Sequence, residues 1–468
     1  MGLPEELRVN AFVDDRPVAA SELSDQISSY LYGKIHTPPE DMGVGGIDAP
    51  APSDPKNWQD PNVGWGLILP ENPNLGNAAK ARAEDAPPPI QELVMKRGSA
   101  PVFRYDSKAD HIGSLRRYYP DGSQDPQLVG SASGVGKGRL PRYLLIYATP
   151  DEIPWSVQFR LNHMAFVGRL DLEGEALENY VTALLDDWGG APAKLNHAVI
   201  WAVDHGGNDI TVLMRRAIAE KLHAEMSGPM AGGCEYIDGS QQGGATQVAL
   251  IAKLIDKKPG LIVTTSHGMT GPLNDAAKMR SQMGLPVDSN YKVLDIDALT
   301  ANWSPGGAIW YAHACCSAGN SAESRLADLM KPGSEVGKLL RELANSGSSM
   351  APLPRKLLGE KQPLRAFIGQ VEPTFDWTLQ HNRTNQILTK STRDALFSRL
   401  YQPYPVGYAL DELHRQSTKL KALQVEALIR NNDGIDNDDE LLAFQLTAYD
   451  RESLVVLGDP VAAFPADE

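Results

Sequence analysis

Two short apolar segments of this chain each end in a side chain that can do covalent chemistry. Residues 261–266 read Leu-Ile-Val-Thr-Thr-Ser and precede His267, and residues 308–314 read Ala-Ile-Trp-Tyr-Ala-His-Ala and precede Cys315. A thiol attacks well only as the thiolate, and a neighbouring imidazole can take its proton and later protonate a leaving amine. The sequence therefore offers His267 and Cys315 as a pair for nucleophilic catalysis.

The same chemistry needs hydrogen-bond donors for the oxyanion that forms when a thiolate adds to a carbonyl. Gly268 directly follows His267, and its N–H can come close to a substrate carbonyl because the residue has no side chain. The N–H of Cys315 is the natural second donor. We therefore expect the amides of Gly268 and Cys315 to form the oxyanion site.

A second thiol, Cys316, directly follows Cys315 and is itself followed by Ser-Ala-Gly. Neighbours in a strand point to opposite faces, so only one of the two thiols is expected to meet His267. Cys315 is the preferred nucleophile and Cys316 is the alternative. A third possibility is that both are small core residues, which is common for cysteine.

The segments that must position these residues read as an α/β fold. Apolar strand-like runs alternate with amphipathic helices from Arg139 onward, and this alternation predicts a parallel sheet with right-handed crossovers. Side chains just past the carboxyl ends of neighbouring parallel strands converge on one crevice, which would bring His267 and Cys315 together. Strands are expected at 64–69, 142–148, 164–170, 198–203, 234–237, 261–265, 308–313, 364–369 and 453–457, and helices at 173–188, 211–226, 246–256, 335–343, 382–401, 407–430 and 438–447.

The order of these segments resembles the caspase-fold (clan CD) cysteine peptidases, in particular the gingipain-like and CHAT-type bacterial members. One strand ends in His-Gly and the next ends in Ala-Cys. Cys315 lies 48 residues after His267, which is in keeping with that fold. Residues 245–260 resemble the helix that leads into the histidine strand, and residues 142–170 the first gingipain-like subdomain. Residues 366–369 and the Gly-Asp-Pro turn at 458–460 are similar to later parts of that fold, so the resemblance spans about residues 140–465.

This resemblance implies a caspase-like parallel sheet flanked by helices, built from two related subdomains. The two subdomains would be residues 139–230, the first α/β subdomain, and residues 231–468, the catalytic subdomain. Residues 1–138 have no counterpart in that fold, and their clustered prolines and glycines predict an irregular N-terminal extension. The implied activity is that of a cytoplasmic, bacterial cysteine endopeptidase (a thiol protease) that hydrolyses protein or peptide substrates through a thioester. Such an enzyme needs neither a metal nor an organic cofactor.

Two other functions remain open for the same residues. The fold could be a catalytically inert scaffold that binds a regulatory protein partner through the Pro-rich segment. Alternatively, the same Cys/His pair could serve an amidase that acts on a small molecule.

Composition narrows the classes of partner. The formal net charge of −15 argues against sequence-independent binding to nucleic acid or to an anionic membrane, and no apolar run is long enough to span a bilayer. The first 20 residues lack the apolar core of a secretory signal. The three cysteines, Cys234, Cys315 and Cys316, suit no disulfide framework and no zinc pattern, which favours a reducing cytoplasm and a metal-free protein.

Several other polar residues are weaker candidates. His205 follows another expected strand in a His-Gly pair, but it is interpreted as a loop or crevice-edge residue outside the catalytic pair. His313 is interpreted as a core histidine. Asp204 or Asp238 could orient His267 or line a pocket for a basic side chain. The acidic run 431–440 does not have EF-hand spacing and is expected to be a solvated loop.

Overall fold

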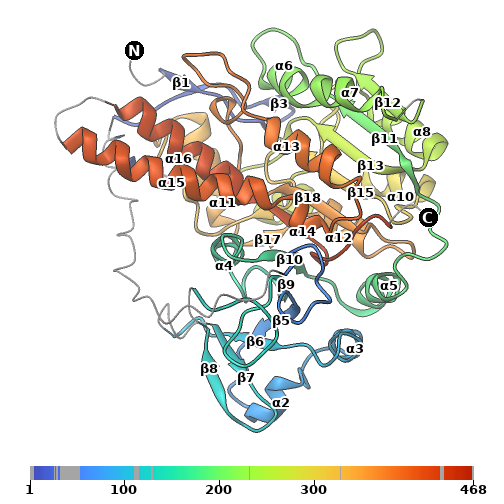
Figure 1. The fold of residues 1–468 in the computed structure, drawn as a ribbon. Coiled ribbons are helices and arrows are strands. Elements are labelled where there is room, and N and C mark those ends of the chain that lie inside the picture. The colour runs from blue at the N-terminus through green and yellow to red at the C-terminus, as the bar shows by residue number, and fades with distance from the viewer. Residues whose placement is uncertain are drawn as a thin grey trace.

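The computed structural model describes residues 5–25, 27, 30–31, 53–109, 115–127, 130–230, 232–326, 328–432 and 437–465. Its main feature is one sheet of 12 strands in the order β12-β11-β13-β15-β18-β19-β10-β9-β5-β6-β7-β8 (Figure 1). The strands are β5 (Trp65–Pro70), β6 (Val102–Tyr105), β7 (Leu115–Tyr118), β8 (Gln124–Pro126), β9 (Tyr143–Tyr147), β10 (Phe166–Leu170), β11 (Lys194–Ala202), β12 (Cys234–Asp238), β13 (Pro259–Thr265), β15 (Ile309–His313), β18 (Ala366–Gln370) and β19 (Leu454–Leu457).

The sheet is mostly parallel and consists of two oppositely directed blocks. Strands β12, β11, β13, β15 and β18 are parallel to one another, as expected from the sequence. Strand β19 pairs antiparallel with β18 and parallel with β10, after which β9, β5 and β6 continue in parallel. Strands β7 and β8 close the far edge as antiparallel strands. The fold is therefore a mixed α/β sheet with flanking helices.

Helices connect and cover the strands, and their ends follow local sequence signals. Thr246 caps α8 by accepting a hydrogen bond from the N–H of Ala249, and Lys258 ends the helix in the left-handed conformation. The helices are α2 (Asn77–Ala81), α3 (Pro88–Lys96), α4 (Trp155–Leu161), α5 (Gly174–Leu185), α6 (Ile210–Met214), α7 (Glu220–Met226), α8 (Gln247–Lys257), α9 (Ala276–Gln282), α10 (Ile296–Asn302), α11 (Glu335–Asn345), α12 (Pro352–Leu358), α13 (Lys390–Asp394), α14 (Val406–Ala409), α15 (Asp411–Asn432) and α16 (Asp438–Ser453).

Both faces of the sheet are buried along its central strands. On β5 and β9 alternate residues point to opposite faces, as the pleat requires. Leu67 and Leu145 join the large cluster that also contains residues of α3 and α5, whereas Ile68 and Leu144 join a smaller cluster with residues of α4. Burial on both faces explains why these strands read as continuous apolar runs.

The N-terminal part of the chain differs most from its sequence-based expectation. Residues 65–105 and 115–126 do not adopt the expected irregular backbone. They form four strands and two helices of the main fold. β5 pairs with β9, so the sheet continues across the expected boundary at residue 138. The strand expected at 64–69 is confirmed as β5. Prolines here begin helix α3 and end β5 instead of interrupting them.

A separate group of short strands lies at the other end of the molecule. These are β1 (Glu6–Leu7), β2 (Ala11–Val13), β3 (Arg16–Pro17) and β4 (Ser21–Glu22), and Figure 1 places β1 and β3 far from β5–β8. Strand β2 pairs parallel with β14 (Gly268–Met269), the segment that follows β13. The beginning of the chain therefore packs against the carboxyl end of the central strand.

One further expectation needs correction. The helix expected at 382–401 begins at Lys390 and continues as a π-helical turn at Ala395–Arg399. Between residues 346 and 351, β17 (Ser349–Met350) pairs with β16 (Gly319–Asn320).

Within the part of the chain that the structure describes, no helix has both the length and the apolar character needed to cross a membrane.

Candidate catalytic site

The ends of β13 and β15 bring the two predicted reactive residues to one place. Thr265 and His313 are the last register partners of these parallel strands, and His267 and Cys315 each lie two residues further on. Neighbouring strands are about 4.8 Å apart, so the two backbones leave the sheet side by side. A Cβ added to Gly268 would lie 2.8 Å from the amide nitrogen of Cys315 and would overlap its carbonyl oxygen. Only glycine allows this close approach.

His267 is held by a carboxylate that the sequence analysis did not select. Its Nε2 lies 2.9 Å from Oδ2 and 3.0 Å from Oδ1 of Asp209, and the ring is 1% exposed. The other ring nitrogen, Nδ1, is buried and makes no hydrogen bond within the described residues. One nitrogen of the imidazole is therefore fixed by a carboxylate and the other is left available, which is the arrangement of a general base.

Asp209 is positioned by the first turn of α6. Its side chain caps this helix by accepting hydrogen bonds from the backbone N–H of Thr211, at 2.8 Å, and from the Thr211 hydroxyl. Burial raises the pKa of Asp209, but the hydrogen bonds from His267 and Thr211 outweigh burial and hold this pKa well below its usual value. Asp209 is therefore ionised beside the imidazole.

Sequence reasoning missed Asp209 because it lies in a loop after a different strand. The alternatives, Asp204 and Asp238, instead form ion pairs with Arg215, at 2.8 and 3.5 Å. Strand β11 pairs with β13, with Ala202 opposite Thr265, so the loop after β11 reaches the same edge as His267. The sequence contained one usable signal, an aspartate at a helix start just after the Asp204-His205-Gly-Gly turn.

His205 lies at the edge of the site, in the loop after β11, which is one of the positions expected for it. Its ring stacks on that of His267 with a centroid distance of 5.4 Å and an interplanar angle of 9°, and on Tyr291 at 4.3 Å and 12°. Its Nε2 is 3.0 Å from the carbonyl oxygen of Asp288. Burial is the main cause that lowers the pKa of His205, so it is neutral near neutral pH. His205 thus forms one wall of the histidine site.

Both candidate thiols are fully buried. Burial and the neighbouring Cys316 side chain raise the pKa of Cys315 well above its usual value, although the N–H of Thr374 lowers it. Cys316 has a φ of 55°, which is left-handed backbone, so the strand alternation assumed for the two cysteines does not apply here. The backbone of Cys315 lies against Gly268, whereas the carbonyl of Cys316 lies against Gly284. This difference keeps Cys315 as the better candidate beside the His-Gly pair.

The predicted oxyanion donor is occupied by another part of the chain. The N–H of Gly268 donates a 2.9 Å hydrogen bond to the backbone carbonyl oxygen of Asn10. Val9 and Ala11, on either side of Asn10, belong to the same apolar cluster as Cys315 and Cys316. The N-terminal segment therefore covers the thiols and places a peptide carbonyl on the amide that the sequence assigned to the oxyanion.

The remaining weaker candidates are located as follows. His313 is buried in the core and bonded to the Tyr311 hydroxyl at 3.0 Å, and burial lowers its pKa to about 3. It is therefore a core histidine, as expected. The acidic run 431–440 lies partly outside the described residues, and Asp438 begins α16.

The histidine site could also hold a cation. Ligand atoms of His205, Asp209 and His267 all lie within 4.8 Å of one another. Histidine nitrogens and a carboxylate oxygen suit zinc and similar metals. A bound cation would take the Nε2 of His267 away from Asp209, so it would compete with the arrangement described above.

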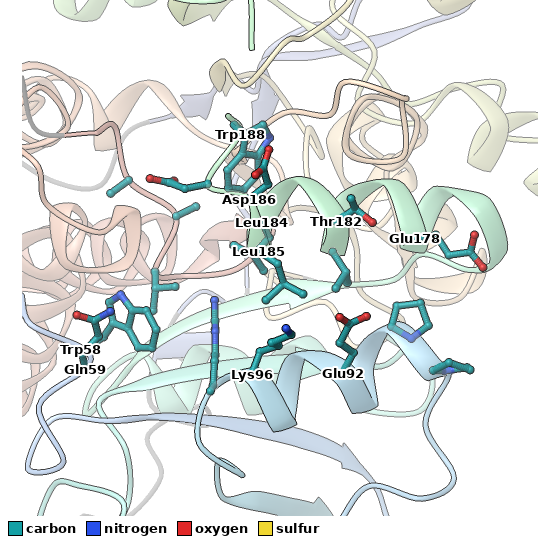
Figure 2. A pocket seen from close by; sticks show the side chains of 18 residues that line it. Trp58, Gln59, Glu92, Lys96, Glu178, Thr182, Leu184, Leu185, Asp186 and Trp188 are labelled. Carbon is teal, nitrogen blue, oxygen red and sulfur yellow. The ribbon is translucent and has the colours of Figure 1, made fainter. Parts of the chain in front are cut away.

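A cavity lies elsewhere in the molecule. It has a volume of about 990 Å³ and opens between α3 and α5 (Figure 2). Glu92 and Lys96 line it from α3, and Glu178 and Thr182 from α5. Neither His267 nor Cys315 lines this cavity.

Comparison with known proteins adds no further information on the site. No protein-family model, no curated protein and no solved structure matches this chain.

Proposed function

We propose that this chain is a cysteine endopeptidase in which Cys315 is the nucleophile, His267 the general base and Asp209 the residue that orients His267. The observation that carries this proposal is the Asp209–His267 pair. The Nε2 atom of His267 is bonded at 2.9 Å, and its Nδ1 atom has no hydrogen-bond partner among the described residues. Cys315 lies two residues past the end of the neighbouring strand β15. We further propose that the mixed α/β sheet has the caspase-like architecture that the sequence resembles.

The reaction follows from the positions of these groups. The Nδ1 of His267 takes the thiol proton, and the Cys315 sulfur forms a bond to the peptide carbonyl carbon. Gly268 and Cys315 donate their N–H groups to the oxyanion. The C–N bond then breaks as His267 passes the proton to the leaving amine. Water, deprotonated by the same imidazole, hydrolyses the thioester and restores the thiol.

Electrostatics supports the division of roles. The ionised carboxylate of Asp209 fixes the tautomer of His267, with the proton on Nε2, and stabilises the imidazolium that forms when Nδ1 accepts the thiol proton. Removal of this carboxylate would leave a ring that is free to rotate or to adopt the wrong tautomer.

A thiol-directed peptide probe tests the proposal. We expect an acyloxymethyl ketone peptide to label the wild-type chain once, at Cys315, and labelling to be lost in Cys315→Ala and His267→Ala but kept in Cys316→Ala. A mixed peptide library should be cleaved by the wild type and left intact by Cys315→Ala. Failure to label or cleave in any variant, including one whose N-terminal segment is displaced, would favour an inert scaffold. Labelling without cleavage of any peptide would favour a small-molecule amidase.

A further inference from the structure

The N-terminal segment, residues 8–12, pairs with two different parts of the chain as it passes the candidate site. Arg8 to Asn10 lie antiparallel to residues 374–376. Val9 forms an antiparallel bridge with Phe375, and the N–H of Asp376 donates to the carbonyl of Arg8 at 3.4 Å. A peptide that adds a strand to an exposed edge makes contacts of this kind.

After Asn10 the chain changes partner. Ala11 pairs with Gly268 and Phe12 with Met269 in β14, and the N–H of Thr270 donates to the carbonyl of Phe12 at 2.9 Å. Asn10 is therefore the residue at which the segment passes from one edge to the other. Its carbonyl, and no other in the segment, accepts the N–H of Gly268.

The side chain of Asn10 is buried and hydrogen-bonded to the backbone. It is 0% exposed, and its Oδ1 accepts the N–H of Thr374 at 3.3 Å. The same N–H also faces the Cys315 sulfur. Asn10 Nδ2 has no partner within the described residues, so no carboxylate oxygen lies within hydrogen-bond distance of it. A buried charge is strongly unfavourable without such a partner, whereas a neutral amide is accommodated.

These contacts point to the identity of the substrate. Resting on the proposed endopeptidase function, we propose that residues 8–12 lie in the substrate groove as a bound peptide does, and that the enzyme cleaves peptides after asparagine. In such a substrate, Cys315 sulfur bonds to the asparagine carbonyl carbon and the bond to the next amide nitrogen breaks. His267 transfers the thiol proton to that nitrogen, and water then releases the asparagine carboxylate.

The flanking residues refine the substrate class. Val9 is 1% exposed and Ala11 is 0% exposed, so an apolar residue before asparagine and a small one after it fit the groove. The guanidinium of Arg8 pairs with Asp376 at 3.2 Å, which favours a basic residue two positions before asparagine. The N-terminal segment carries this whole pattern and acts as an intramolecular competitor of external peptides.

Kinetics with the full chain tests the inference. The substrates are Arg-Val-Xaa-Ala peptides with Asn, Gln, Asp, Lys or Arg at Xaa, assayed with the wild type, Asn10→Lys and Arg16→Ala. Arg16 lies just beyond this segment but forms an exposed pair with Glu335, so its replacement is the matched control. We expect asparagine peptides to be preferred by at least about tenfold in kcat/KM. Asn10→Lys should raise that rate at least about tenfold by displacing the segment, because a lysine is not accommodated in the buried position of Asn10. Arg16→Ala should change it less than about twofold.

Different failures have different meanings. Cleavage after another residue, or equal rates in the wild type and Asn10→Lys, would overturn the groove assignment while the endopeptidase proposal stands. An absence of both cleavage and Cys315 labelling in both proteins would overturn the endopeptidase proposal itself, and the groove assignment with it. Should Asn10→Lys fail to fold by circular dichroism, Asn10→Gly keeps the backbone and removes only the buried side chain. It should also raise the rate on asparagine peptides, and an unchanged rate would overturn the inference.

Discussion

The Nε2 atom of His267 lies 2.9 Å from a carboxylate oxygen of Asp209, although the two residues follow different strands. This contact joins the loop after β11 to the end of β13. It fixes the orientation of the imidazole at the same edge of the sheet where β15 delivers Cys315.

The first prediction concerns this carboxylate. Asp209→Asn keeps the size of the side chain but removes its charge and allows the wrong tautomer of His267. We expect kcat on a peptide substrate to fall by about a hundredfold to ten-thousandfold with a smaller change in KM. Asp238→Asn is the control, because Asp238 is half-buried and forms its ion pair with Arg215 at 3.5 Å, whereas His267 pairs with Asp209. A similar loss in both variants would contradict the assigned role.

Asp209→Asn should also change how the free energy of unfolding depends on pH. The pKa of Asp209 is lower in the folded protein than in the unfolded chain, so its contribution to stability is present above the ordinary aspartate pKa. That contribution is lost as the pH falls below this value towards the folded pKa. Denaturant unfolding of wild type and Asp209→Asn should therefore differ at pH 7 and converge in acid. Curves separated by a constant amount at every pH would exclude this linkage.

The second prediction concerns the Cys315 thiol. Because burial raises its pKa, it stays protonated through the pH range in which an exposed thiol ionises. Iodoacetamide should modify wild-type Cys315 slowly at pH 7 and faster as the pH rises. Asn10→Lys should speed the reaction at pH 7, because displacement of the N-terminal segment exposes the sulfur.

Cys234 provides an internal reference for that experiment. Burial, followed by the charge of Glu235, raises its pKa to about 11, and it lies in β12, away from the N-terminal segment. Its modification rate should be the same in both proteins. Peptide mass spectrometry in a Cys316→Ala background assigns the remaining signal to Cys315, and unchanged Cys315 labelling would show that the segment does not shield it.

The third prediction concerns the close approach of two strand ends. In Gly268→Ala, the new methyl group would overlap the carbonyl of Cys315, so one of the two backbones must move. We expect a loss of about 1–3 kcal/mol in the free energy of unfolding and a much lower rate of peptide-probe labelling at Cys315. Gly228→Ala is the control, since nothing lies within 4 Å of the added methyl group there. A Gly268→Ala protein of wild-type stability and labelling rate would mean that the two ends are not in contact.

The fourth prediction concerns a buried ion cluster behind the site. Glu452 bonds His163 at 2.8 Å and Arg325 at 2.6 Å, and it also pairs with Lys421. Burial raises the pKa of Glu452, but these partners lower it to about 2. A shift of this size from the usual value corresponds to about 3 kcal/mol. Glu452→Gln should therefore lose about that much stability at pH 7.

The sign of the shift sets the pH window for this loss. A depressed pKa gives stability above the unfolded value of 4.5, and this stability is lost as the pH falls towards about 2. Wild type and Glu452→Gln should therefore converge in that range. Asp394→Asn, which breaks an exposed pair with Lys390, should cost less than about 0.5 kcal/mol. Equal losses in the two variants would mean that burial does not strengthen the Glu452 cluster.

Local patterns in the sequence were sufficient to locate most strands. Runs such as residues 143–147 and 309–313 are apolar because both faces of their strands are covered, and such runs are visible in one dimension. The positions of His267 and Cys315 could be predicted for the same reason, since each directly follows one of these runs. The high proline content wrongly predicted irregular backbone for the segment that forms β5 to β8. A proline at the end of a strand or helix leaves that element intact.

Pairing between distant segments was decided only by the tertiary structure. The contact of Asp209 with His267 depends on β11 lying beside β13 and on the path of the loop that follows β11, and neither has a periodic signature. The position of Asn10 on the Gly268 amide depends on a strand from the other end of the chain. Local propensity acts over a few residues, whereas such contacts are selected by the packing of the whole fold. The candidate reactive residues could therefore be predicted from the sequence, whereas the groups that orient and cover them could not.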